Sequence, residues 1–393
     1  NQVFQKIIED LDFAIQWLPE AGSEEANRLN KDIARHVKAR FCLNEGTHYK
    51  YHDELEYASE AEKWLQMAAT ESDKLITSGR YEIYNTGHPQ EDYFNMYRID
   101  DKSDLKEAVL YVDYKTNIRE HNMAAAGREA GCGFSKSFVE SFLCSDGLPI
   151  SLSNKYLGDE TMRKETANRD PRLKQLILTN DFPTNVTDDL KDSTFVVNED
   201  EFITQHCFTG YRPIKGFNPI YSQALYMKSS FDGIAYRYAE TLLINAEAKA
   251  ELNTITNADL DRTVNQLRDR VGMPHLTVNV GFTDPKWPDW GYSLSPVLQE
   301  IRRERCIELA GEGFRFNDLK RWKAGKLLNN VLTYVGKRKP DGNLAIVYPN
   351  YTNPDLSYQA GKSRTWEDKM YLYPIPTGEL QRNPQLLPQN PGW

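Results

Sequence analysis

The sequence predicts a mainly α-helical protein in which helical hairpins support a loop-rich lobe with a few short strands. Apolar residues recur at the three- and four-residue spacing of a helix in two parts of the chain, residues 1–80 and 235–325. Elsewhere, in residues 81–234 and 326–393, this periodicity is mostly lost and turn-forming residues are frequent. No low-complexity linker separates these parts, so we expect one unit over residues 1–393.

Three amphipathic helices are expected in the N-terminal part. Apolar residues fall on one helical face over residues 3–18, 31–43 and 55–78, and proline or glycine follows the first and the last of these. Ala61 and Ala68 lie seven residues apart, so small side chains would allow two helices to approach closely. This pattern is typical of stacked helical hairpins, although a simple helical bundle remains an alternative.

A long stretch without periodicity follows the first expected strand. Residues 107–114, EAVLYVDY, are rich in β-branched and aromatic residues and predict a short strand. Residues 115–134 then lack any period, and loops of this length in a globular protein are uncommon unless they bind something. Their planar hydrogen-bonding side chains make Asn117, His121 and Arg128 candidate ligand-binding residues. A single histidine is nevertheless more often a solvated loop residue than a ligand contact.

Aromatic side chains are frequent in two other irregular stretches. Residues 195–226 contain many, and the sequence GFTDPKWPDWGY, residues 281–292, places Trp287 and Trp290 three residues apart. Such rings either pack beneath loops or stand exposed as platforms for a sugar or a peptide side chain. We keep both tryptophans as candidate ligand-binding residues, while packing against the helix that follows is the favoured alternative.

Helix signals and charges are densest in residues 295–325, SPVLQEIRRERCIELAGEGFRFNDLKRWKAG. Ser295 is a good N-cap, Pro296 suits the first helical position, and two glycines end the helix after Leu309. A helical projection places charged residues on the same face as the apolar ones. A buried charge is costly unless it is paired, so Arg305, together with Glu308 three residues later, should belong to a partnered set.

The glutamates of this helix allow two interpretations. Glu304, Glu308 and Glu312 recur every four residues, so they could converge for acid–base chemistry or on a metal ion. Neighbouring arginines would lower carboxylate pKa values, which suits ion pairs better than a general acid. We therefore expect a structural cluster of these three glutamates with Arg305 and Arg315, and no catalytic residue.

Composition excludes several classes of function. A net charge of -9 argues against binding to a nucleic-acid backbone, and no apolar run approaches the length of a membrane-spanning helix. The five cysteines are dispersed without a CxxC pair, which indicates neither a disulfide framework nor a zinc site. The acidic residues 181–192 could hold calcium, but their spacing matches no known cage. We expect no metal and no cofactor.

Two long segments resemble one protein family. Residues 301–325, IRRERCIELAGEGFRFNDLKRWKAG, and 371–393, YLYPIPTGELQRNPQLLPQNPGW, resemble the signature helix and the C-terminus of the SusD/RagB family, surface lipoproteins of Bacteroidetes. The resemblance implies tetratricopeptide-like hairpins and an N-terminal portion, with a lipid anchor, that this chain lacks. Ligand contacts of that family come partly from loops before the helix at 235, which makes Tyr211 with Arg212 candidates as an exposed pair. The proline-rich C-terminus should be extended and docked.

The function implied by this resemblance is nutrient capture at the surface of the outer membrane. Exposed aromatic, amide and arginine side chains would bind a glycan weakly and deliver it to a SusC-like TonB-dependent transporter. Peptide capture is an alternative, because Arg119, Arg128 and Arg212 would also suit peptide carboxylates. A glycoside hydrolase is the alternative function among enzymes, since the many acidic residues could include a catalytic pair.

Overall fold

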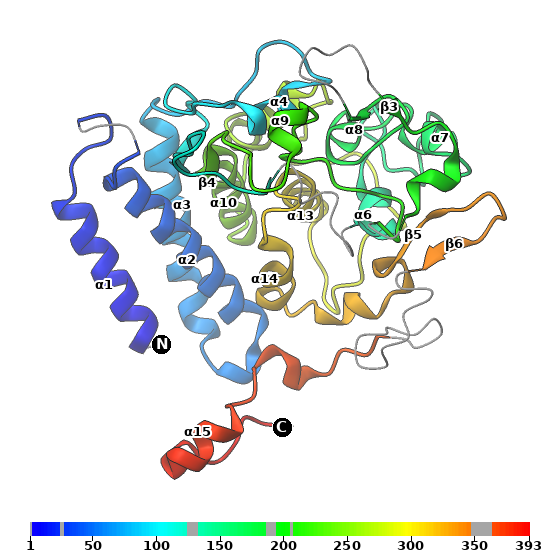
Figure 1. Cartoon of the computed structure of the whole chain (residues 1–393). Helices are drawn as coiled ribbons and strands as arrows, with labels where there is room; N and C mark the ends of the chain where they lie inside the picture. Colours follow the sequence, from blue (N-terminus) through cyan, green and yellow to red (C-terminus); the bar gives the residue numbers. More distant parts are fainter. Residues whose placement is uncertain (1, 24–26, 124–132, 186–193, 205–206, 347–363) are drawn as a thin grey trace.

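The computed structural model describes residues 2–23, 27–123, 133–185, 194–204, 207–346 and 364–393. Its N-terminal part is a row of helices that lie side by side: α1 (Gln2–Trp17), α2 (Lys31–Tyr51) and α3 (Ala58–Thr77) (Figure 1). The Asn30 side chain caps α2 by accepting from the backbone N–H groups of Asp32 and Ile33. Ala61 and Ala68 are buried. The three helices expected from apolar periodicity are therefore present.

Helix α2 runs eight residues beyond the end expected at Leu43. The extension, residues 44–51, lacks a clear apolar period, yet Gly46, Thr47 and Tyr49 are buried in it. A Cβ atom on Gly46 would lie only 2.9 Å from the Leu65 side chain of α3. Close contact with α3 thus stabilises a segment whose own sequence predicts little.

A second group of helices continues the row: α10 (Tyr238–Glu251), α11 (Asn257–Asp261), α12 (Val264–Arg270), α13 (Pro296–Glu308) and α14 (Phe314–Arg321). Helix α10 is buried on nearly all sides and packs against α2, α3 and α13. Ile301 of α13 packs into the apolar core around α10, whereas Ile307 packs into the core of the loop-rich lobe. Helix α13 therefore lies between scaffold and lobe, at the centre of the molecule (Figure 1).

Regular structure in the rest of the chain is short. Three two-stranded antiparallel sheets occur among the described residues: β1 (Ala108–Val112) with β4 (Gly233–Arg237), β2 (Pro183–Asn185) with β3 (Thr194–Phe195), and β5 (Val335–Arg338) with β6 (Leu344–Ile346). The short helices are α4 (Asp92–Asn95), α6 (Lys136–Ser141), α7 (Met162–Thr166), α8 (Arg172–Leu176) and α9 (Tyr221–Ala224). Pairing with β1 holds residues 235–237 in a strand, so α10 begins three residues later than the apolar period suggests.

The C-terminal segment differs from the expectation that it is extended and docked. It contains a short helix, α15 (Thr377–Arg382), and much of it projects below the other helices (Figure 1). Pro376 directly precedes this helix and no proline lies inside it, so the prolines do not prevent a helical turn. Tyr373 is 67% exposed and Trp393 is 47% exposed. The segment is thus neither wholly extended nor buried.

None of the described helices combines the length and the apolarity that crossing a membrane would require.

Candidate functional site

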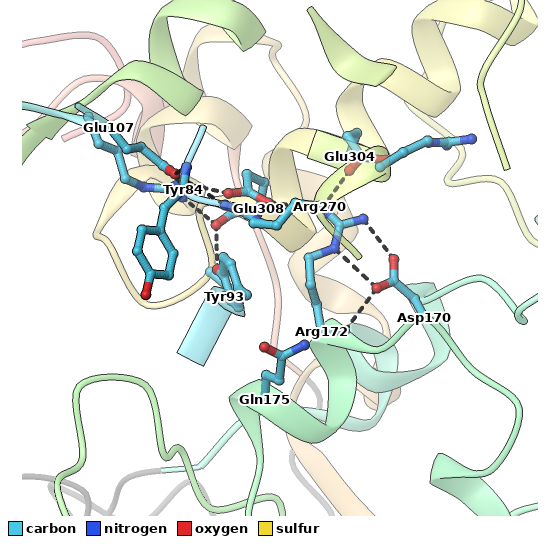
Figure 2. Close-up of polar contacts among 12 residues, drawn as sticks. Tyr84, Tyr93, Glu107, Asp170, Arg172, Gln175, Arg270, Glu304 and Glu308 are labelled. Carbon is cyan, nitrogen blue, oxygen red and sulfur yellow. Dashed lines mark hydrogen bonds and ion pairs between the residues drawn. The ribbon is translucent and has the colours of Figure 1, made fainter. Parts of the chain in front are cut away.

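A buried ion-pair network surrounds the glutamates of α13. Glu308 is 0% exposed and accepts hydrogen bonds from Arg172 (3.0 Å), Arg237 (2.6 Å) and Arg270 (2.6 Å). These arginines come from α8, β4 and α12, so one carboxylate joins three separate elements to α13. Figure 2 shows Glu304, one turn before Glu308, on the same side of the helix, with Arg172 and Arg270 reaching toward the pair.

Further carboxylates complete the network. Arg172 also donates to Glu304 and to Asp170, and Arg237 also donates to Glu312. Burial raises the pKa of Glu308, but the three arginines outweigh this effect and hold it well below its usual value. The carboxylate therefore stays ionised in a closed environment, which suits bracing between elements and not proton donation.

Two arginines expected in this network lie elsewhere. Arg305 donates from Nε to Asp318 of α14 at 2.9 Å, and the ion pairs of the described residues do not join it to Glu308. Arg315 is exposed, with its guanidinium 5.9 Å from the centre of the Trp322 ring. The expected Arg305–Glu308 pair is therefore wrong, because the tight turn after α13 brings Asp318 beside Arg305 while arginines from distant elements reach Glu308.

Tyr211 corrects the expectation of an exposed ring. Its side chain is 0% exposed, and its hydroxyl lies 2.8 Å from both carboxylate oxygens of Glu165. The backbone around it runs through the core of the lobe, where Leu178 donates to the carbonyl of Arg212 and Phe134 donates to that of Tyr211. The Arg212 side chain is half-buried. Tyr211 is thus a core residue that no ligand reaches without rearrangement of the lobe.

The two tryptophans of residues 281–292 both contact α13. Trp290 is 6% exposed, donates from Nε1 to Gln299 at 2.6 Å and packs edge-on against Trp322. Trp287 is partly exposed and donates from Nε1 to Glu300 at 2.7 Å. Trp290 therefore packs against the helix, as the alternative interpretation predicts, and offers no open platform, whereas Trp287 remains partly exposed.

The loop around His121 pairs with the chain after α9. His121 and Ser229 exchange two backbone hydrogen bonds, at 2.9 and 3.1 Å. The His121 ring donates from Nε2 to the carbonyl of Phe231 and accepts at Nδ1 from the N–H of Met123. Burial lowers the pKa of His121, in agreement with this neutral tautomer. Because both ring nitrogens are occupied, His121 positions the loop and does not face a ligand.

This pairing brings residues 115–123 beside residues 221–231, and both segments carry exposed apolar side chains, which we call the loop surface. It consists of Ile118, Met123, Tyr221, Leu225, Tyr226 and Met227. Tyr226 is 76% exposed and Tyr221 59%. Neither tyrosine was singled out from the sequence, since nothing in residues 195–226 distinguishes them from the buried rings. An exposed apolar patch of this kind marks a binding surface in many soluble proteins.

Polar groups border the loop surface and hold its shape. Asn117, at its edge, is exposed and adopts a left-handed backbone conformation with φ 62°. Met227 has φ 55°, which is unusual for methionine, and its N–H donates to the Asn122 side chain at 3.0 Å. Strained backbone that its neighbours hold in place is frequent at ligand clamps. The Arg119 guanidinium lies 5.0 Å from the centre of the Tyr114 ring.

Several expected features fall outside the part of the chain that the structure describes. Arg128 lies there, as does most of the acidic stretch 181–192. Across the described ranges, no group of three or more His, Cys, Asp or Glu side chains is arranged to hold a metal ion.

Comparison with known proteins decides the family. The sequence profile of the SusD family matches residues 68–393. The chain belongs to the SusD family. A curated relative, SusD-like protein P2 of Formosa agariphila, is 24% identical over 406 aligned positions, and this chain spans 65% of its length, just under two thirds.

Solved structures share the fold. A SusD-like protein of Bacteroides fragilis is 25% identical with a TM-score of 0.70, and the match covers 100% of this chain and 71% of that one. A SusD-like carbohydrate binding protein of the same species is 21% identical, with a TM-score of 0.66 and coverage of 98% and 71%. Surface glycan-binding protein A of Bacteroides fluxus is 18% identical, with a TM-score of 0.55 and coverage of 100% and 70%. The tetratricopeptide-like helical fold of SusD-like proteins is thus confirmed.

Proposed function

We propose that this protein binds a nutrient glycan at the cell surface and delivers it to a SusC-like TonB-dependent transporter of the outer membrane. The observation that carries the proposal is the loop surface, where Tyr221 and Tyr226 are exposed and where Asn117, next to Ile118 in the chain, is exposed as well. Membership of the SusD family supports it. So do the descriptions of two proteins of the same fold, one as carbohydrate binding and one as surface glycan-binding.

The chemistry of the loop surface suits a sugar. A tyrosine ring offers an apolar face to the C–H groups of a pyranose, while neighbouring amides exchange hydrogen bonds with its hydroxyls. The Asn122–Met227 hydrogen bond and the backbone pairing at His121 hold the loops in place before a ligand arrives, which lowers the entropic cost of binding. Binding by this subunit alone should be weak and reversible, and contacts with the transporter would strengthen it.

The same proposal assigns a role to each part of the chain. Residues 1–80 and 235–325 would serve as the helical scaffold that faces the transporter, and residues 81–234 and 326–393 as the loop-rich lobe and the C-terminal segment. The α13 network ties the two together through Arg172 of the lobe, which pairs with Glu308 of the scaffold. A lipid anchor would hold the protein at the outer membrane, as the family implies.

Binding without catalysis is part of the proposal. A glycoside hydrolase needs two carboxylates that flank the scissile bond in an accessible site. Glu304 and Glu308 are buried and each accepts hydrogen bonds from arginine. This arrangement favours the structural role over the hydrolytic one.

Calorimetric titration against matched panels of neutral glycans and of peptides tests the proposal. We expect glycan binding that weakens at least fivefold in Tyr226→Ala, because truncation of a central aromatic contact commonly costs more than about 1 kcal/mol. Tyr373→Ala is the matched control, since Tyr373 is similarly exposed but lies in the C-terminal segment. Peptide binding with no response to glycans would overturn the choice of ligand. Release of reducing sugar that is lost on one carboxylate substitution would establish a hydrolase.

A further inference from the structure

A second hollow lies on the helical scaffold and shares no residue with the loop surface. It is an open groove of about 520 Å³ between residues 81–85, the end of α3, the start of α10 and α12. Its volume falls within the range of roughly 300–1,000 Å³ that small-ligand sites occupy. Tyr81, Asn85, Tyr238, Arg262, Gln266 and Asp269 are among the residues that line it.

One wall of the groove is an extended segment. Tyr81, Glu82, Ile83 and Asn85 of this segment line the groove. Between them, the backbone N–H of Tyr84 donates to the Glu107 carboxylate at 2.7 Å, which ties this wall to the start of β1.

Another wall of the groove belongs to α12 and to Arg262, which precedes it. Gln266 and Asp269 are three residues apart on α12, so they share one helical face, and both line the groove together with Arg262. The Gln266 amide donates from Nε2 to the carbonyl of Arg262 at 2.8 Å, which orients its oxygen-bearing end. This wall therefore presents a row of polar side chains.

Two tyrosines form the floor. The rings of Tyr81 and Tyr238 are stacked, with centroids 5.9 Å apart. Burial raises the pKa of Tyr238 to about 12, although the Arg262 guanidinium opposes this shift, so the hydroxyl keeps its proton. Tyr238 is 3% exposed, but no hydrogen bond among the described residues engages its hydroxyl, and the residue lines the groove. It can donate to a ligand.

The charged side chains that line the groove already form ion pairs with other residues. Arg262 pairs with Asp73 at 3.0 Å, Asp269 with His275 at 2.7 Å, and Glu82 with Lys106 at 3.0 Å. A charged ligand would have to compete with these partners. A neutral ligand rich in hydroxyl groups would instead meet the amides of Asn85 and Gln266 and the hydroxyl of Tyr238.

We propose that this groove is a second glycan-binding site, which takes a short stretch of a neutral saccharide on the scaffold side of the protein. The ligand class rests on the proposed function, whereas the place of the site rests on the groove alone. Two sites on one chain make a long glycan bind more tightly than a short one, because the second contact becomes intramolecular.

Titration of the full chain with neutral gluco-, manno- and galacto-oligosaccharides tests this inference in four proteins: the unaltered chain, Tyr226→Ala, Tyr238→Phe and the double variant. Tyr238→Phe removes one hydroxyl and keeps the ring stacked on Tyr81, so folding is preserved. We expect residual binding in Tyr226→Ala that falls about fivefold in the double variant, the effect of one lost hydrogen bond. Tyr373→Phe is the matched control and should change nothing.

Asn85→Leu gives a second, independent reading, because Asn85 is exposed and its replacement leaves the core intact. It should weaken the same residual binding. If Tyr226→Ala removes all binding while Tyr238→Phe and Asn85→Leu bind as the unaltered chain does, the groove is no glycan site and the proposed function stands. If the unaltered chain binds none of the saccharides, both proposals fall.

Discussion

Replacing Glu308 by glutamine should destabilise the protein strongly. The carboxylate is fully buried and accepts from Arg172, Arg237 and Arg270 at 3.0, 2.6 and 2.6 Å. Glutamine keeps the shape but removes the charge and turns an N–H₂ group toward at least one guanidinium. Charged hydrogen bonds contribute about 1.5–3 kcal/mol each, and removing one partner of a buried ion pair costs about 3–5 kcal/mol. We expect the free energy of unfolding to fall by about 4 kcal/mol, since the arginines keep other carboxylate partners.

Urea unfolding followed by tryptophan fluorescence measures this loss. Glu379→Gln is the matched control, because the same substitution there affects only an exposed pair with Arg382, 2.9 Å apart on α15. Such a pair contributes roughly 0–1 kcal/mol. If Glu308→Gln unfolds at the same urea concentration as Glu379→Gln, the bracing role of the α13 network is refuted.

Two further predictions concern stability. Glu240 is buried beside His36 and Arg40, which outweigh the burial that raises its pKa and lower it from 4.5 to about 2. The stability that it contributes is present above pH 4.5 and is lost as the pH falls toward about 2, so acid titration of the urea midpoint should show a loss of about 3 kcal/mol that Glu240→Gln lacks. Gly336→Ala should cost about 1–3 kcal/mol, because its Cβ would lie 2.0 Å from the Thr209 carbonyl oxygen. Gly378→Ala, which meets nothing within 4 Å, should be neutral, and equal thermal midpoints for the two alanine variants would contradict this reasoning.

The α13 network supports the loops that we propose bind the glycan. Glu308 holds α8 of the lobe and α12 of the scaffold at fixed positions. The loop surface lies on irregular chain, and binding residues placed on loops gain precision from a rigid support. We therefore expect partial loss of glycan affinity in Glu308→Gln even where it is fully folded.

Local signals in the sequence were sufficient to place the long helices, but not the short helix α15 or every helix end. Ser295 caps α13 by accepting from the N–H of Leu298, and Pro296 occupies its first position, as the residue types alone predict. Helix α2 shows the limit of such signals, because its last two turns depend on contact with Leu65 of α3. The paired strands at residue 235 delay α10 for the same reason.

Burial of individual side chains was decided by tertiary structure. Tyr211 and Tyr226 belong to one aromatic stretch of the chain, yet the first is 0% and the second 76% exposed. The partners of Glu308 lie 38 to 136 residues away, so no spacing within α13 could name them. The sequence by itself determined where the long helices lie and that charges on α13 must be paired, because these follow from interactions within a few residues, and its motifs were sufficient to indicate the family. Which rings face solvent and which arginines meet which glutamates depends on contacts between distant segments, and these exist only once the chain has folded.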